Sequence, residues 1–364
     1  MIIYIIVALF PLLVGMAYDM RATVGISQEE LQTKRQIRIR WWWLFIAALP
    51  MFTLIALRHF LIGADTSVYL KFFKEMVDTP WEHIFIVNED GYRFEVGFVV
   101  FEKLLTHVTH NPEVYQVIYT AIYLVSIVTF ANNLEKHNFA FLYIFATIGL
   151  YTFMFTGVRQ CLAMCICLWS YPFIKKRKLI WFLLLLLLAF MFHKSAILFI
   201  AAYFIYNRKI GWINTIIYAI FATLAYIYID VIQEWFNDAL DYDYGIERTG
   251  NGIIFFSVMA MVTAFSLFTI VYYRKHTPEF AGMINIGIIA LVMWLLRLVT
   301  RVAERPSFYF MFFSAAMLCY ALDAPPEGRD KVVFRVLVYG AFMALYIYKF
   351  LTSFVTLVPY RWFF

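Results

Sequence analysis

Apolar runs of about 15 to 20 residues recur along this chain, and short charged connectors separate them. A run of this length is what an α-helix needs to cross a bilayer. Hydrophobic residues make up 63% of the sequence and charged residues only 15%, whereas soluble domains carry about 25% charged residues. The runs are continuous and do not alternate with polar residues, which argues against a β-barrel. The sequence therefore predicts an all-α, polytopic transmembrane protein.

Basic residues gather in the connectors, as the positive-inside rule expects of cytoplasmic loops. Five connectors show this pattern: 21–40, 175–178, 207–209, 274–276 and 329–331. The formal net charge of +6 is therefore a topology signal, and we expect no nucleic-acid partner. An even number of spans must separate successive inside connectors. This gives about twelve spans in a single membrane domain, 1–364, with the N-terminus outside. The segment Ile2 to Tyr18 lacks a preceding basic residue, so we interpret it as a retained span.

One apolar segment must stay out of the membrane to satisfy this parity. Segment 94–110 carries Glu102, Lys103 and other charged residues, so we expect an amphipathic helix at the outer interface. Excluding it as a span places two long loops outside, 58–93 and the acidic loop 230–252. Most of the polar residues at membrane depth then converge on the outer side.

Four cysteines lie inside apolar runs, where packing is the expected role of a thiol. They are Cys161, Cys165, Cys167 and Cys319. No His or acid stands at ligand spacing beside them, so we expect no disulfide and no metal there. His107 and His110 have a possible ligand spacing but no third ligand nearby. Nucleotide-binding glycine loops are missing from the sequence as well, so we expect no cofactor.

Arg159 interrupts the apolar sequence, in the stretch Phe-Thr-Gly-Val-Arg-Gln that begins at Phe155. A guanidinium stays charged, and a charge at membrane depth usually faces a polar cavity with a function. Arg159 and Gln160 would bind an anionic group, because a guanidinium matches phosphate oxygens in bidentate fashion. The alternative is a helix-end arginine that snorkels to the lipid headgroups. We favour recognition of an anion.

A second interruption follows a Leu-rich run, in the stretch His-Lys-Ser that begins at His193. His193 is a candidate proton acceptor or phosphate contact, and the alternative is the polar turn of a helical hairpin. Asp65, Asp90, Glu95 and Glu304 are candidate bases, because a hydroxyl that attacks must lose its proton. The sequence does not choose among these carboxylates.

A third charged group consists of Arg297, Arg301, Glu304 and Arg305. Spacings of four, three and one residues would place most of them on one helix face. Three arginines with one acid leave a net positive charge, which suits a diphosphate site without a metal. The alternative is a salt-bridge ladder at the interface, and the position of Arg297 about one turn inside the apolar run argues against it.

Five motifs follow one another in order along most of the chain. They are Arg58-x4-Gly63-Ala64-Asp65-Thr66-x2-Tyr69, Glu95-x-Gly97-Phe98, Phe155-Thr156-Gly157-Val158-Arg159-Gln160, Phe192-His193-Lys194-Ser195-Ala196 and Pro359-Tyr360-Arg361. In this arrangement the chain resembles the EpsG family, a branch of the Wzy-type bacterial polysaccharide polymerases. The Gly-x-Arg-Gln motif followed by His-x-Ser-Ala is the most specific part of the resemblance.

The resemblance implies an integral glycosyltransferase of the GT-C-like kind in the bacterial cytoplasmic (inner) membrane, with an active site that faces the periplasm or the cell exterior. Such polymerases join oligosaccharide repeat units carried on undecaprenyl diphosphate. The implied reaction is independent of metal, because arginines stabilise the diphosphate leaving group. The implied partners are the lipid-linked oligosaccharides, membrane lipids and a chain-length regulator.

For this chemistry the candidate site residues fall into three groups. The candidate catalytic residues are Asp65, Glu95, His193 and Glu304. The candidate diphosphate-binding residues are Arg58, Arg159, Gln160, Arg297, Arg301 and Arg305. The candidate glycan-binding residues are Tyr69, Ser195 and Tyr360.

Three other functions compete with polymerisation. A flippase or transporter for lipid-linked oligosaccharide would also need outward arginines, but it predicts an internal repeat that the sequence lacks. An O-antigen ligase-like transferase would share the diphosphate site and differ only in its acceptor. A membrane acyltransferase would need a His-Asp constellation that we do not find.

Overall fold

The computed structural model describes residues 1–22, 33–134, 138–240, 252–274 and 276–363. In these residues the regular structure is helical, and the only strand-like pairing is an isolated bridge between Arg58 and Trp362. The prediction of an all-α protein is confirmed. Much of the expected acidic loop 230–252 falls in residues 241–251, which lie outside the described residues.

The segment Ile2 to Tyr18, which we expected to be a span, is helical throughout. Among the described residues, six helices are long and apolar enough to cross a bilayer. A seventh candidate span consists of two helices joined with a bend of 75°, Trp212–Ile227 and Ile229–Trp235. Three shorter apolar helices cover Asn138–Thr147, Leu179–Phe192 and Lys194–Ile205. The membrane helices are confirmed, whereas the count of about twelve spans is not.

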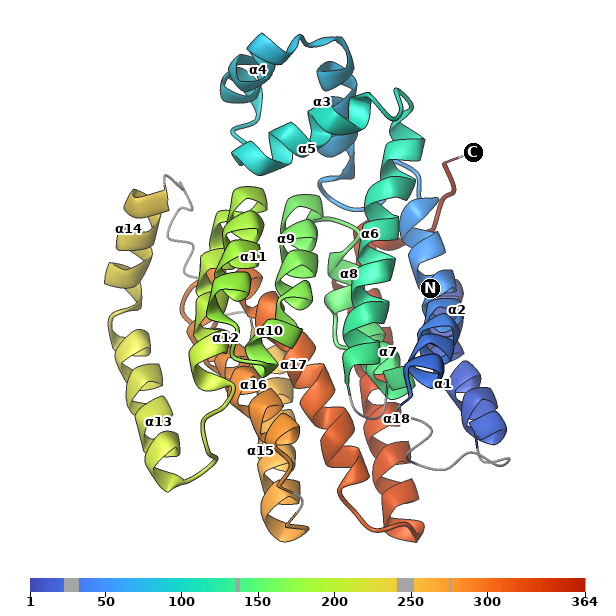
Figure 1. The fold of residues 1–364 in the computed structure, drawn as a ribbon, viewed down its shortest axis with the longest axis vertical. Helices are drawn as coiled ribbons and strands as arrows, with labels where there is room; N and C mark the ends of the chain where they lie inside the picture. Colours follow the sequence, from blue (N-terminus) through green and yellow to red (C-terminus); the bar gives the residue numbers. More distant parts are fainter. Residues whose placement is uncertain (23–32, 135–137, 241–251, 275, 364) are drawn as a thin grey trace. The chain divides into compact units, whose positions relative to one another are not determined.

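The helices pack into two compact units, each assembled from segments that are distant in sequence. The first unit comprises Met1–Pro172, Leu184–His193 and Val336–Phe364. Its helices are α1 (Ile2–Ala22), α2 (Lys34–Ala56), α3 (Thr66–Asp78), η2 (Trp81–His83), α4 (Ile84–Gly91), α5 (Val96–Thr106), α6 (Pro112–Asn133), α7 (Asn138–Thr147), α8 (Leu150–Phe153), α9 (Val158–Trp169), η5 (Val355–Leu357) and parts of α11 (Leu179–Phe192) and α18 (Arg329–Thr352) (Figure 1). Within it, α2 packs against α1 and α6, and α6 packs against α9.

The second unit comprises Phe173–Leu183 and Lys194–Arg335. Its helices are η3 (Lys194–Phe199), α12 (Ile200–Ile205), α13 (Trp212–Ile227), α14 (Ile229–Leu240), α15 (Ile253–Tyr272), α16 (Pro278–Leu296), η4 (Arg301–Ala303) and α17 (Glu304–Asp323), and α10 (Tyr171–Lys175) runs into it. Here α16 packs against both α15 and α17. Helix α17 is buried along almost its whole length, so it forms the core of this unit.

Local sequence fixes where two of the long helices begin. Asn111 precedes Pro112, and the Asn side chain accepts hydrogen bonds from the first free backbone N–H groups of α6. Thr277 precedes Pro278 and caps α16 in the same way. An Asn or Thr cap satisfies backbone donors that lack a partner within the helix, and proline suits the first helical position because it has no N–H to lose.

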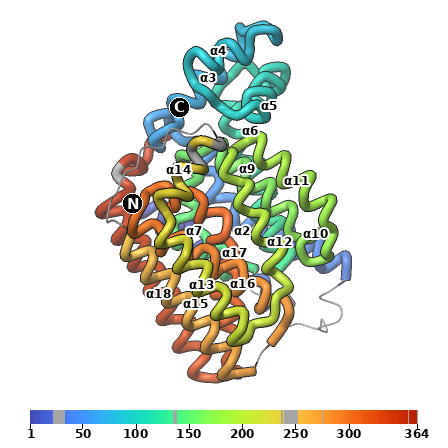
Figure 2. Tube along the Cα trace, turned by 90° about the vertical axis from the view of Figure 1, so that its left-hand side faces the viewer, coloured from blue at the N-terminus to red at the C-terminus, as the bar shows by residue number. Residues whose placement is uncertain are grey.

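Helices α3, α4 and α5 form a small outer layer of the first unit, next to the start of α6 (Figure 1). Figure 2 shows the same grouping in a view turned by 90°. The outer loop 58–93 is thus largely helical. Residues 66–78 form α3, and Asp65 stands at its N-cap position.

Segment 94–110 contains the expected helix, α5, but its charged face points inward. Glu102 is fully buried and accepts a hydrogen bond from Tyr115 Oη at 2.5 Å. Lys103 Nζ donates to the carbonyl oxygen of Met76 at 2.8 Å. The exposed residues of the segment include Leu104 and Val108. An apolar outer face suits a helix that lies against lipid, so the interfacial placement of this segment stays our prediction.

Candidate active site

Three titratable side chains from distant parts of the sequence converge within the first unit. Arg159 Nη1 donates a hydrogen bond to Glu95 Oε2, and the two residues form a salt bridge. His193 Nδ1 lies 3.0 Å from Glu95 Oε1. The carboxylate of Glu95 therefore bridges a guanidinium and an imidazole. We call these three residues the Glu95 cluster.

Each member of the Glu95 cluster is placed by the end of a helix. Glu95 is the N-cap residue of α5 and has an extended backbone. Arg159 is the second residue of α9, which begins after the break at Gly157. His193 directly follows α11, and its backbone N–H donates to Ala189 O at 3.0 Å. The chain changes direction at all three positions, so the side chains project from helix ends and not from the middle of a span.

A close contact between α5 and the end of α11 holds Glu95 against His193. A Cβ atom at Gly97 would lie 2.6 Å from the Cβ of Met191, so only glycine fits there. Met191 stands two residues before His193. The spacing of Glu95 and Gly97 in the sequence motif thus has a physical basis, because the glycine admits the helix that carries the imidazole.

The Glu95 cluster is largely shielded from solvent. The exposed fraction of the side chain is 5% for Glu95, 4% for His193 and 17% for Arg159. The ring of Phe94 lies against the guanidinium, with 4.4 Å between Arg159 Cζ and the ring centroid. An aromatic face favours a cation at this distance. Arg159 is the most exposed member of the cluster.

This arrangement provides a base and an anion-binding group side by side. When Nδ1 of the neutral imidazole donates to Glu95, the lone pair of His193 is on Nε2, which is the atom that accepts a proton. The carboxylate orients the ring and stabilises the imidazolium that forms. The guanidinium of Arg159 keeps its charge throughout and suits phosphate oxygens.

Arg58 lies in the first unit but outside the Glu95 cluster. Its exposed fraction is 1%, and its guanidinium donates to the carbonyl of Ile55 and to the hydroxyls of Thr66 and Tyr119. Protein groups surround the guanidinium on all sides. This placement does not favour the predicted contact between Arg58 and a diphosphate.

Four other predicted residues of the first unit have different settings. Gln160 follows Arg159 in α9 and is 3% exposed. Asp65 is partly exposed at the start of α3, and its side chain makes no capping hydrogen bond. Tyr69 is buried, with its ring 5.6 Å from that of Phe94. Tyr360 donates a hydrogen bond from its hydroxyl to the backbone of α2. The contacts predicted between glycan and the two tyrosines stay predictions.

In the second unit, four predicted residues lie where α16 gives way to α17: Arg297 just after α16, Arg301 in η4, and Glu304 and Arg305 at the start of α17. The expectation that they share one helix face is wrong, because α16 ends before Arg297 and η4 separates it from α17. Arg297 Nε donates to Glu304 Oε2 at 2.7 Å. Arg301 and Arg305 are exposed. We call these four residues the Arg297 turn.

Ser195 also belongs to the second unit. It is part of η3, which begins one residue after His193, and it is partly buried. Its hydroxyl donates to Tyr309 Oη at 3.3 Å. The hydroxyl thus bonds to a neighbouring helix, and contact with a glycan stays a prediction.

Phe94, Thr66 and Tyr119 are the neighbours of the predicted residues that sequence analysis missed. Phe94 precedes the motif residue Glu95, and Thr66 belongs to the first motif, but neither was assigned a role because the neighbouring carboxylates suggested chemistry more directly. Tyr119 lies in an apolar run with many other aromatic residues. No sequence signal distinguishes it, because only the fold brings it to Arg58.

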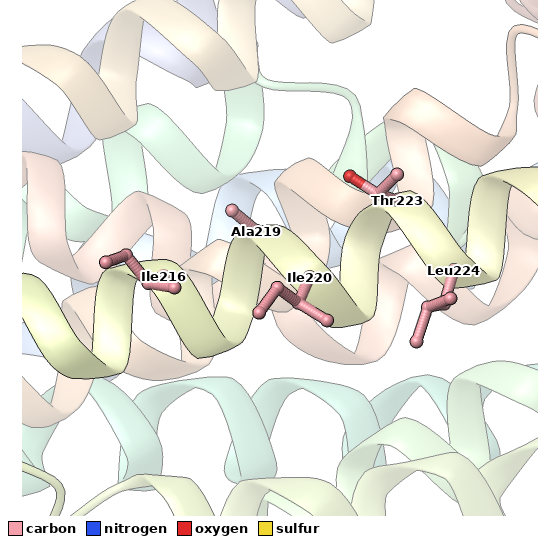
Figure 3. Close-up of a pocket in the computed structure, with 5 residues that line it drawn as sticks. All are labelled: Ile216, Ala219, Ile220, Thr223 and Leu224. Carbon is pink, nitrogen blue, oxygen red and sulfur yellow. The ribbon is translucent and has the colours of Figure 1, made fainter.

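The cysteines and the groove along α13 do not suit the chemistry of an anionic ligand. The residues that the structure describes contain no group of three or more His, Cys, Asp or Glu side chains that could hold a metal ion. The four cysteines are buried and free. An open groove of about 280 Å³ runs along α13 and is lined by Ile216, Ala219, Ile220, Thr223 and Leu224 (Figure 3). Its only polar side chain is a threonine, so it does not suit an anionic group.

The fold and the site together define a helical membrane protein with a buried acid–imidazole–guanidinium cluster. The chain belongs to the EpsG family, whose model matches residues 41–362, nearly the whole chain. This is a family of Wzy-type polymerase-like proteins. The matched region contains all the candidate site residues, from Arg58 to Tyr360, and the resemblance identified from the motifs is confirmed. Comparison with curated proteins and with solved structures gave no match.

Proposed function

We propose that this protein is a polysaccharide polymerase that joins oligosaccharide repeat units carried on undecaprenyl diphosphate. In the proposed reaction, a hydroxyl oxygen of the acceptor unit attacks the anomeric carbon of the donor glycan. A new glycosidic bond forms, and the bond between that carbon and the phosphate oxygen breaks. The lipid diphosphate leaves with the electron pair, and the acceptor hydroxyl loses its proton to a base. The donor is already activated, so the reaction needs no nucleotide.

The Glu95 cluster is the observation that carries this proposal. We assign the role of base to His193, which takes the hydroxyl proton at Nε2. Glu95 orients the ring through Nδ1 and stabilises its protonated form. Arg159 binds the diphosphate, where negative charge builds up as the leaving group departs. A fixed cation in a site shielded from water stabilises that charge more than it would in bulk water, and the protein thereby replaces a metal ion.

The Arg297 turn is the second part of the proposal. Arg301 and Arg305 are exposed cations that would attract the anionic head of a lipid-linked unit. Arg297 pairs with Glu304, and this pair fixes the turn that carries the other two arginines. Replacing both exposed arginines by Gln should raise the KM for lipid-linked oligosaccharide by a few-fold with little change in kcat, because solvent screens exposed charges. A loss of kcat with an unchanged KM would contradict this role.

We further propose that the helices form about twelve spans in a GT-C-like arrangement within the bacterial inner membrane, and that the site faces the periplasm or cell exterior. The basic connectors support this topology, because cytoplasmic loops carry an excess of Lys and Arg. The helices α3, α4 and α5 support the placement of the site at the outer face, because α5 exposes apolar side chains that suit the membrane interface. Membrane lipids and a chain-length regulator are the other proposed partners.

The decisive experiment replaces Arg159 by Ala or Lys in cells that lack the native gene. Surface glycan is then separated on a gel, and lipid-linked units are localised to the inner or outer leaflet. We expect the ladder of polymers to collapse to a single repeat unit, with lipid-linked units accumulating on the outer leaflet. The matched control is Lys71→Ala, which removes a cation that is 73% exposed from the same unit and should leave the ladder intact.

Two other outcomes would overturn the proposal. Units trapped on the inner leaflet would indicate a flippase. Intact polymer that accumulates on undecaprenyl diphosphate without reaching its final acceptor would indicate a ligase-like transferase. A normal ladder in an Arg159→Ala strain with normal protein abundance would remove Arg159 from the site.

A further inference from the structure

We propose that Arg58 and Thr66 are positioning residues that hold both sides of the Glu95 cluster in place, and that neither touches substrate. The inference rests on the proposed function, because it concerns the same site. It assigns to Arg58 a role different from the phosphate contact that its charge alone suggests.

The guanidinium of Arg58 is enclosed by hydrogen-bond acceptors from three elements. Nη1 donates to Ile55 O at 2.5 Å, and Nη2 donates to Tyr119 Oη at 2.9 Å and to Thr66 Oγ1 at 3.2 Å. Nε lies 3.3 Å from both Ile62 O and Thr66 Oγ1. Among the described residues, no carboxylate forms a salt bridge with Arg58. Directed acceptors thus take the place of a counter-ion, which ties α2, α3 and α6 together.

Thr66 carries this connection to the segment that presents Arg159. Its hydroxyl accepts from Arg58 and has two carbonyl acceptors for its single proton, Ile62 O at 2.7 Å and Phe155 O at 3.1 Å. Phe155 stands four residues before Arg159. A Cβ atom at Gly63 would lie 2.0 Å from the same carbonyl oxygen, so the loop before α3 packs directly onto this segment. The backbone that leads to Arg159 is therefore held by the loop that Arg58 organises.

A second connection runs through α3 to the other side of the cluster. Thr66 is the first residue of α3, and Tyr69 and Phe72 lie one and two turns further along. Their rings lie 5.6 and 4.9 Å from the ring of Phe94. Phe94 precedes Glu95 in the chain and packs on the guanidinium of Arg159. Displacing the start of α3 would thus shift the neighbours of Glu95 and Arg159 together.

Lysine cannot reproduce this arrangement. Arg58 uses a planar fork to reach acceptors in several directions, whereas an ammonium group is a compact charge on a flexible stem. Arg58→Lys should therefore keep the charge and lose the geometry. If Arg58 bound phosphate, lysine would preserve much of the attraction, so this substitution separates the two roles.

The test measures kcat and KM for lipid-linked oligosaccharide in purified wild-type protein and three variants. Thr66→Val keeps the side-chain shape and removes the hydroxyl, and Thr66→Ser keeps the hydroxyl as the matched control. We expect Arg58→Lys and Thr66→Val to lower kcat by about tenfold to a hundredfold, because small misplacements of catalytic groups have effects of this size. The KM should stay within about twofold of wild type, since neither residue contacts substrate. Thr66→Ser should restore most of the activity.

The double variant Arg58→Lys/Thr66→Val should be little worse than either single variant, because both act through one connection. An unchanged kcat with a raised KM in Arg58→Lys would place Arg58 on the substrate and overturn the proposal. Equal losses in Thr66→Val and Thr66→Ser would also overturn it, since the hydroxyl would then be irrelevant. If Arg58→Lys fails to accumulate, the two Thr66 variants decide the question. A wild-type protein without polymerase activity would reject the proposed function itself, whereas an active wild type with a normal Thr66→Val variant rejects only the positioning role.

Discussion

The two charged groups of this protein differ in how the chain assembles them. In the Glu95 cluster, the acid is separated from its partners by 64 and 98 residues, and it is almost fully buried. In the Arg297 turn, the acid is 7 residues from its partner and 34% exposed. A local pair of a partly exposed acid and a buried arginine suits a turn between two helices. Removing a carboxylate from water costs free energy that largely cancels the attraction of its partners, so a buried acid adds little net stability. A functional role is therefore the better explanation for the burial of Glu95.

The sharpest test of this difference replaces each acid by its neutral isostere. Glu95→Gln keeps the size of the side chain but no longer stabilises a protonated His193. We expect kcat to fall by about a hundredfold or more, since loss of the acid that orients a catalytic imidazole has effects of at least this size. Glu304→Gln should lower kcat by no more than about threefold, because the acid is partly exposed and the amide oxygen can still accept a hydrogen bond from Arg297.

The measurement is polymer formation from lipid-linked units by equal amounts of purified protein. Thermal unfolding in detergent serves as the control for folding in both variants. Equal activity losses in Glu95→Gln and Glu304→Gln would erase the distinction between the two groups. A larger loss in Glu304→Gln would move the catalytic base to the Arg297 turn.

The general architecture followed from the sequence because each of its determinants is local. Apolar runs specify helices wherever they occur, and Asn111 and Thr277 mark helix starts on their own. Arg159 and His193 were identified as candidates because charge inside apolar sequence is rare, and Glu95 was one of four carboxylates considered as the base. Their meeting at one carboxylate was not predictable, because it depends on how α5, α9 and α11 pack.

The errors of the sequence analysis have the same origin. Regular spacing suggested one helix face for the Arg297 turn, but the helix breaks after Leu296. Charge suggested a water-facing side for α5, but Glu102 and Lys103 point inward, to Tyr115 of α6 and to the Met76 carbonyl of α3. Periodicity describes a helix well and gives no information on which neighbours satisfy its polar groups.

The two units also differ in how tightly the chain packs around a glycine. Gly63 in the first unit has φ +90°, and an added Cβ would meet the backbone oxygen of Phe155 at 2.0 Å. A Cβ atom added at Gly287 in the second unit would lie 2.7 Å from the sulfur of Met317, which belongs to a flexible side chain. We expect Gly63→Ala to destabilise the protein by about 2 to 4 kcal/mol. The backbone of Phe155 cannot easily move away from the new Cβ, and alanine adopts a φ of +90° only at a cost in free energy.

Gly287→Ala should change stability by no more than about 1 kcal/mol, since alanine favours a helix and Met317 can adjust its rotamer. Protein abundance in membranes and the unfolding temperature in detergent report both effects. A Gly63→Ala variant as stable as Gly287→Ala would show that the loop before α3 is loosely held, which would also weaken the connection from Arg58 to Arg159.

The smallest expected effects come from two acids outside the spans, one in each unit. Burial raises the pKa of Glu102 well above its usual range, and the hydrogen bond from Tyr115 opposes this only in part. The folded protein then prefers the protonated carboxyl, so stability falls as pH rises above the unfolded pKa of about 4.3. In the second unit, a hydrogen bond and the charge of Lys331 lower the pKa of exposed Glu327. Its contribution is therefore present above the unfolded pKa and is lost as pH falls through the lowered value.

Glutamine at each position should therefore shift stability in opposite directions at neutral pH. Glu102→Gln should raise the unfolding temperature at pH 7 and match wild type near pH 4, because an amide resembles the protonated acid that burial favours. Glu327→Gln should lower it slightly at pH 7, and the difference should vanish in acid. Unfolding temperatures between pH 4 and pH 8 test the sign for Glu102, and measurements extended below pH 4 test the loss of the Glu327 contribution. A drop at pH 7 in Glu102→Gln would mean that Glu102 is ionised in the folded protein, and the outer layer would then hold a second charged acid close to Glu95 in the sequence.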